Sequence, residues 1–199
     1  MKNNREHVLK VATKLISQRG FDGASTREIA QTAKVSQGMI NYYFGSKEAL
    51  LKEIINDYQE QINNTIKSIV HSNLEGLEFL SLASRKFFDL GMRNRDLARV
   101  LMVEEMMEMR QEVITQSDEV GSSITNIFVD KIEEGKKNGT FNKNADSELI
   151  VSFLINTLND YIIREERVYF NTLKDPYSEA AQQRLLDFSD HYLKTMLSN

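Results

Sequence analysis

The residues best suited to chemistry lie between positions 26 and 47, and the chemistry they suit is recognition of a nucleic acid. Arg27 can donate two parallel hydrogen bonds to guanine, or it can bind a phosphate; both roles fit its type. Gln37 can recognise adenine and Met39 can contact a thymine methyl group, while Gly38 leaves room for close approach. The residues predicted to contact DNA are Thr26, Arg27, Ser36, Gln37, Gly38, Met39, Asn41, Tyr42, Tyr43 and Lys47.

Several members of this set suit the DNA backbone rather than the bases. Thr26, Ser36 and Lys47 can contact phosphates. Lys47 also lies at a predicted helix start, where backbone N–H groups favour an anion. Tyr42 and Tyr43 can pack on sugars and donate to phosphate oxygens.

Two short helices joined by a tight turn must position these side chains. Ser25 and Glu28 form a capping-box pattern at the start of the first helix. Ser36 can cap the second helix, which ends near Phe44. Ile40 and Phe44, four residues apart, give the second helix one buried face, so its polar and aromatic residues face outward. This is the helix-turn-helix arrangement, whose second helix enters the DNA major groove.

Three segments at fixed spacing resemble the N-terminal signature of the TetR (tetracycline-repressor-like) family of transcriptional regulators. They are Thr-Arg-Glu-Ile-Ala at 26–30, Ala-Lys-Val-Ser-Gln-Gly at 33–38 and Tyr-Phe-Gly-Ser-Lys-Glu-Ala-Leu at 43–50. The resemblance extends over about residues 5 to 55. Asn41 departs from the pattern, because the family usually has tyrosine there. We expect Met39 and Asn41 to set the sequence preference.

Charge distribution supports a polyanionic partner although the net charge is −4. Residues 1–47 hold eight Lys/Arg against three Asp/Glu, which gives +5. The remainder holds 17 against 26, which gives −9. A basic N-terminal region on an acidic body can orient the chain on DNA.

Composition predicts a cytoplasmic protein outside the membrane. No cysteine is present, which excludes disulfides and fits a reducing compartment. No stretch approaches the ~18 apolar residues that a membrane helix needs, and the N-terminus lacks an apolar signal region.

Apolar periodicity predicts an all-α fold with two domains. A three-helix helix-turn-helix DNA-binding domain occupies residues 1–47, and a six-helix ligand-binding and dimerisation domain occupies 48–199. The predicted helices cover about 5–19, 26–33, 36–44, 46–70, 77–92, 97–115, 118–138, 147–171 and 175–197.

The second domain has the composition of an apolar ligand pocket. Five of the eight methionines lie between positions 92 and 109, where they can adapt to varied apolar ligands or simply fill the core. Asn156 and Asp160 interrupt an apolar band and can bind a ligand, or form hydrogen bonds in the core or across a subunit seam. The residues predicted to contact a ligand are Phe87, Met102, Glu105, Met106, Phe128, Asn156 and Asp160.

The TetR resemblance implies a ligand-responsive regulator, most simply a repressor. Such proteins dimerise through their last two long helices and bind an inverted-repeat operator, with recognition helices ~34 Å apart. A small-molecule effector would tilt the helix at 46–70, and a coupling of ~1–3 kcal/mol suffices for release. A hydrophobic effector such as a drug, lipid or acyl compound fits the interior, and the glutamates at 104, 105 and 108 leave a cationic one open.

Three alternative functions agree with the sequence to different degrees. Enzymatic activity is not expected, because His7, His71 and His191 lie far apart and no phosphate loop, metal cluster or serine elbow is present. We therefore predict no cofactor and no metal. A helical ligand-binding or protein-interaction module without operator binding conflicts with the intact pattern at 26–47. A transcriptional activator of the same architecture remains open, since the sign depends on operator position.

Overall fold

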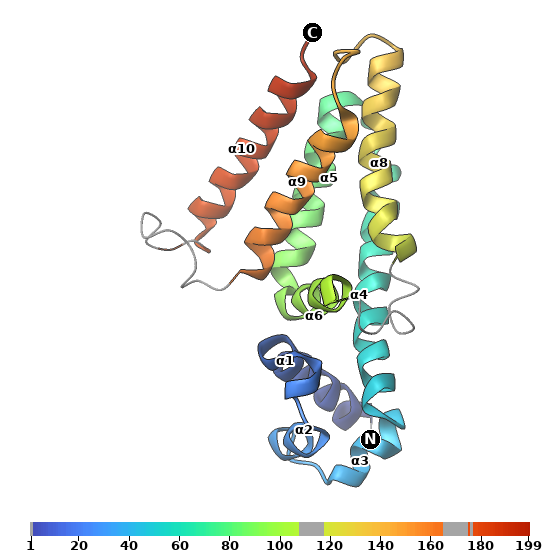
Figure 1. The fold of residues 1–199 in the computed structure, drawn as a ribbon, viewed down its shortest axis with the longest axis vertical. Helices are drawn as coiled ribbons and strands as arrows, with labels where there is room; N and C mark the ends of the chain where they lie inside the picture. The colour runs from blue at the N-terminus through green and yellow to red at the C-terminus, as the bar shows by residue number, and fades with distance from the viewer. Residues whose placement is uncertain (1, 108–117, 165–174, 176) are drawn as a thin grey trace. The chain divides into compact units, whose positions relative to one another are not determined.

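A computed structural model describes residues 2–107, 118–164, 175 and 177–199. Nine helices and no strand are found in these residues, so the prediction of an all-α fold is confirmed (Figure 1). The helices are α1 (Lys2–Gly23), α2 (Thr26–Thr32), α3 (Gln37–Phe44), α4 (Lys47–Val70), α5 (Gly76–Arg93), α6 (Arg95–Met107), α8 (Asp118–Lys137), α9 (Ser147–Ile163) and α10 (Glu179–Leu197). None of the described helices is both long enough and apolar enough to cross a bilayer.

The chain forms two compact units. The first unit comprises Met1–Gln61 and Asn94–Glu119, and the second comprises Ile62–Arg93 and Val120–Asn199. Helix α6 packs against α1 within the first unit.

The first three helices form around a small apolar core that the sequence pattern predicted. The core residues from α1 to α3 are Val8, Ala12, Leu15, Ile16, Phe21, Ala24, Ile29, Ala30, Ala33, Ile40 and Phe44. Gly20 was predicted to end the first helix, and it has the non-helical angles φ 73° and ψ 167° that glycine adopts without a Cβ clash. The chain then resumes helical geometry as far as Gly23.

Serine caps define the helix starts in this unit, with two departures from prediction. The backbone N of Glu28 donates to Ser25 Oγ at 3.1 Å, and that of Ala49 donates to Ser46 Oγ at 3.0 Å. The Glu28 carboxylate, however, pairs with Arg19. Ser36 is the N-cap residue of α3, but its side chain forms no capping hydrogen bond.

The second unit is organised around α5, which contacts both α9 and α10 (Figure 1). Its buried residues are Phe79, Leu80, Ala83, Ser84, Phe87, Phe88, Leu90 and Gly91. A Cβ at Gly91 would lie 2.4 Å from Ile162 Cδ1 on α9, so glycine allows α5 and α9 to approach closely. The prediction that this helix is central to its domain agrees with its burial.

Two helix ends differ from prediction for local reasons. The helix predicted to reach 171 ends at Ile163, because Arg164 has an extended ψ of 142°. The last helix begins at Glu179 rather than at 175, because Ser178 Oγ accepts a hydrogen bond from Ala181 N and caps the helix there. Pro176 and the predicted helical stretches at 108–115 and 165–171 lie outside the described residues.

Candidate nucleic-acid interface

Helix α3 has one buried and one exposed face, as its sequence pattern predicted. Ile40 and Phe44 are buried in the core of the first unit. Gln37 and Asn41 are exposed, and Tyr42 is 74% exposed, which is unusual for a tyrosine. The helix therefore presents polar and aromatic groups to solvent.

Helix α2 supports the start of α3 through side-chain contact. Gln37 Nε2 donates to Thr26 Oγ1 at 3.4 Å, which brings these two predicted DNA contacts together. A Cβ added at Gly38 would meet nothing within 4 Å, so the surface there is open. Ser36 is exposed, and its hydroxyl is not used for capping. The Ser36 hydroxyl can therefore approach a phosphate without first breaking a capping hydrogen bond.

Arg27 differs from Arg5 and Arg19, the two arginines of α1, by its lack of a carboxylate partner among the described residues. Arg5 pairs with Glu53 at 2.6 Å, and Arg19 pairs with Glu28. Arg27 is exposed, and within the described part of the chain no hydrogen bond or ion pair engages its guanidinium. Its planar donors are thus available to a base edge or a phosphate.

Lys34 belongs to the same surface, although it was not among the predicted contacts. It lies in the turn between α2 and α3, with a positive φ of 56°, and is exposed. Among the described residues no acidic side chain pairs with it. Its position two residues before the α3 cap, Ser36, was the signal that could have identified it.

Lys47 lies in a different environment from the one predicted. Its ammonium donates to the backbone carbonyl of Phe21 and lies 4.1 Å from the centroid of the Phe21 ring. These contacts join the start of α4 to the end of α1. The ammonium is therefore engaged inside the protein rather than exposed to a phosphate.

Tyr43 also departs from the expectation of an exposed phosphate donor. Its hydroxyl is buried and has no hydrogen-bond partner in the described structure. The ring packs against Tyr42 with centroids 5.5 Å apart in an edge-to-face arrangement. Tyr42 thus presents its polar end to solvent, while Tyr43 holds an unsatisfied hydroxyl just beneath the surface.

The predicted ligand contacts divide between the two units. Met102 and Glu105 are half-buried on α6 of the first unit. Burial and then the charge of Glu105 raise the pKa of Tyr58 on α4, so Glu105 lies near that phenol. The side chain of Met106 lies outside the described residues.

In the second unit, Phe87 and Phe128 are buried core residues. Asn156 and Asp160 lie exposed on α9. Asn156 Nδ2 donates to Ser152 Oγ at 3.2 Å, and Asp160 pairs with Arg164. Both therefore belong to the exposed surface of α9, so the alternative of a hydrogen bond in the core does not apply to them.

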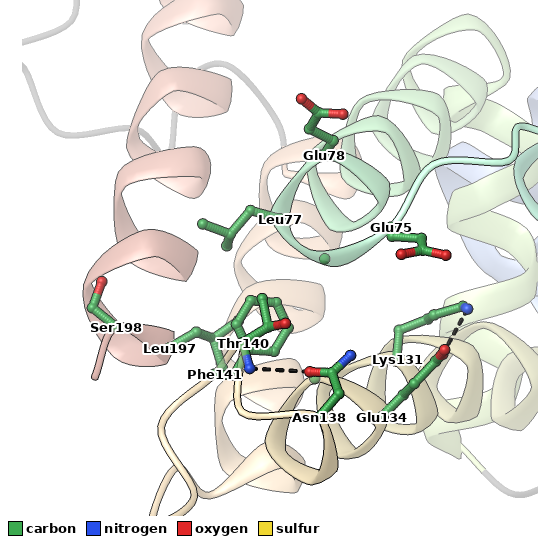
Figure 2. Close-up of a pocket in the computed structure, with 12 residues that line it drawn as sticks. Glu75, Leu77, Glu78, Lys131, Glu134, Asn138, Thr140, Phe141, Leu197 and Ser198 are labelled. Carbon is green, nitrogen blue, oxygen red and sulfur yellow. Dashed lines mark hydrogen bonds and ion pairs between the residues drawn. The ribbon is translucent and has the colours of Figure 1, made fainter.

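A pocket of about 360 Å³ lies at one end of the second unit, formed by α5, α8, the α8–α9 connection and the end of α10 (Figure 2). Phe141 and Leu197 supply buried apolar surface there. A Cβ at Gly135 would lie 2.2 Å from the Phe141 ring, so glycine is needed for that packing. Lys131 pairs with Glu134 at 2.7 Å across one edge. None of the predicted ligand contacts lines this pocket.

A second hollow, the α9–α10 groove, is apolar and shallow. Its volume is about 260 Å³, and its lining residues are Phe153, Leu154, Thr157, Phe188, Ser189 and Tyr192. Phe153 is 65% exposed and Phe188 is 59% exposed. Leu149 and Met196 extend this exposed apolar surface along the same two helices. Apolar patches of this kind mark interaction surfaces.

Comparison with known proteins finds matches to the N-terminal region and to most of the chain. Residues 8–54 match the family model described as bacterial regulatory proteins, tetR family. The chain is 26% identical over 156 residues to the transcriptional repressor KstR2 of Rhodococcus jostii, covering 77% of this chain and 75% of that protein.

Solved structures of similar fold cover nearly the full length. The ketosteroid transcriptional regulator KstR2 of Mycobacterium tuberculosis superposes with a TM-score of 0.83 at 20% identity, covering 98% of this chain and 95% of that one. AibR, solved in complex with isovaleryl coenzyme A and operator DNA, gives a TM-score of 0.76 at 16% identity, with 97% of each chain covered.

Proposed function

Because this chain belongs to the TetR family of bacterial regulatory proteins, we propose that it is a ligand-responsive repressor that binds an inverted-repeat operator as a homodimer. As a family member it is a transcriptional regulator with a helix-turn-helix DNA-binding region. The observation that carries the proposal is the outward face of α3. Gln37, Asn41 and Tyr42 are exposed there, and Arg27 is exposed on α2, whose Thr26 contacts Gln37; this composition suits the major groove.

Contacts within this surface have different tasks in the proposed complex. Arg27 reads a base edge, and Gln37 and Asn41 lie where α3 faces the groove. Ser36, Thr26 and Lys34 bind the phosphates that flank it. The open surface at Gly38 lets the backbone of α3 approach the DNA.

The α9–α10 groove supports homodimerisation. A second copy is the proposed occupant, because a two-fold axis would place the same exposed phenylalanines, Phe153 and Phe188, on both sides of one seam. Asn156 and Asp160 are exposed on α9 and would border this seam. A dimer that places its two helix-turn-helix regions one DNA turn apart, ~34 Å, requires an operator with inverted-repeat symmetry.

The proposed effector is an acyl group carried on coenzyme A. AibR was solved with isovaleryl coenzyme A, whose acyl group is apolar, and KstR2 is named a ketosteroid regulator. An apolar acyl chain fits the hydrophobic effector that the sequence predicts. Binding would displace α4, which begins directly after α3, and so release the operator.

Fluorescence anisotropy on DNA from upstream of the chain's own gene tests this function. At two salt concentrations, the wild type should bind roughly a thousandfold more tightly than it binds scrambled DNA. Arg27→Ala should weaken binding by about 1–3 kcal/mol. Lys143→Ala, which removes one exposed cation of the second unit, is the matched control and should bind as the wild type does.

Two results would contradict the proposal in different ways. Equal affinity for specific and scrambled DNA would support the alternative of a module without operator binding. Tight operator binding that increases rather than decreases reporter expression would favour an activator. Release of the operator by acyl-coenzyme A esters, measured in the same assay, tests the effector class separately.

A further inference from the structure

Helix α4 holds two buried polar side-chain atoms that no described residue satisfies. Asn56 Oδ1 and Gln59 Nε2 have no hydrogen-bond partner in the described structure. Gln59 is only 5% exposed, so water does not reach its amide freely. Leaving a buried amide without a partner is unfavourable, and native proteins rarely do so without a functional reason.

The two atoms together require one hydrogen-bond donor and one acceptor. They lie three residues apart on a helix, so their side chains emerge on neighbouring parts of its surface. Asn56 Oδ1 accepts a hydrogen bond and Gln59 Nε2 donates one. A carboxylate would satisfy only Gln59 and an ammonium only Asn56. A neutral group that both donates and accepts, such as an amide or a hydroxyl, satisfies both.

We infer that Asn56 and Gln59 bind the amide-bearing pantetheine arm of an acyl-coenzyme A effector. The inference rests on the proposed function for the effector class. Pantetheine carries two amide groups, each with one donor and one acceptor, and neither is charged. The acyl chain, which has no such groups, supplies no partner for these atoms.

The position of the pair links this contact to regulation. Both residues lie in the segment of α4 that belongs to the first unit, together with the helix-turn-helix. An effector held there contacts the helix that begins three residues after α3 ends. Binding at Asn56 and Gln59 therefore acts directly on the support of the recognition helix.

Gln59→Met tests the inference because it should stabilise the unliganded protein and weaken its response to the effector. Methionine has a similar shape and no amide, so the unliganded variant should melt about 2–4 °C higher than the wild type. Operator affinity should stay within twofold. The concentration of octanoyl-coenzyme A that half-releases the operator should rise at least tenfold. Asn56→Leu should shift half-release in the same direction.

Gln61→Met is the matched control on the same helix. Gln61 Nε2 already donates to Asp57 at 3.3 Å, so its replacement should neither raise the melting temperature nor alter half-release. Direct binding of octanoyl-coenzyme A, coenzyme A and free octanoate is measured by calorimetry on each variant. Octanoate should bind weakly and lose no affinity in Gln59→Met.

Each failure has its own signature. If the wild type binds octanoyl-coenzyme A and Gln59→Met binds it equally, the inference is overturned while the proposed function stands. If Gln59→Met is less stable than the wild type, a bound water satisfies the amide and the inference also fails. If the wild type binds its operator but no coenzyme A ester, the effector class and the inference fail together.

Discussion

Ser17 Oγ on α1 donates a 2.7 Å hydrogen bond to Asp96 Oδ1 in the first turn of α6. Ser17 is buried, and its hydroxyl also contacts the carbonyl of Lys14. Asp96 lies at the N-terminal end of α6, where a carboxylate is favoured by the helix dipole. This contact joins residues 79 positions apart and ties α6 to the bundle that carries the recognition helix.

Ser17→Ala should lower the free energy of unfolding by about 1 kcal/mol, because it removes a buried hydrogen bond to a charged acceptor. Urea denaturation measures the change, and amide exchange in α6 should become faster. Ser84→Ala is the matched control, since that buried hydroxyl donates to Leu80 O within its own helix. Equal losses in the two variants would mean that the link to Asp96 adds nothing.

Lys47→Met should weaken the protein rather than its phosphate contacts. The ammonium donates to Phe21 O and lies over the Phe21 ring, so its removal should lower the free energy of unfolding by about 1–2 kcal/mol. The slope of log affinity against log salt should not change. Lys34→Met should do the reverse, with unchanged stability and a slope reduced by about 1. A reduced slope in Lys47→Met would restore its predicted role at a phosphate.

Tyr43→Phe separates folding from DNA binding. Its buried hydroxyl has no partner among the described residues, so phenylalanine should leave the melting temperature unchanged or slightly higher. If a phosphate satisfies the hydroxyl in the complex, operator affinity should fall roughly tenfold. Anisotropy on operator and scrambled duplexes measures both affinities. A lower melting temperature together with full operator affinity would show a structural role instead.

Local features of the helix-turn-helix region were predictable because they depend on residues that are close in sequence. Ile40 and Phe44 are four positions apart, so helical periodicity alone assigned them to the buried face. Ser25 and Ser46 cap helices through contacts three residues away. The family resemblance over the same region agreed with this local pattern.

Contacts between distant segments were not predictable by the same means. Periodicity shows that a residue is buried, but not which helix covers it. The packing of α6 against α1 was therefore not predicted. Lys47 was assigned to a phosphate because nothing in the sequence links it to Phe21, 26 positions away. Asn156 and Asp160 were predicted to interrupt an apolar band of one helix. Part of that band, at Leu149 and Phe153, is exposed.

Phe153→Glu should break the proposed homodimer without unfolding the subunit. Phe153 is largely exposed, so a charge there costs little in the monomer. In a symmetric seam the substitution would bury one unpaired carboxylate from each subunit, which is costly. We expect a monomer at micromolar concentration in analytical ultracentrifugation, an unchanged helical circular dichroism spectrum and loss of operator binding. Val70→Glu, an exposed apolar residue outside the groove, should stay dimeric. A Phe153→Glu dimer of wild-type affinity would exclude this face as the seam.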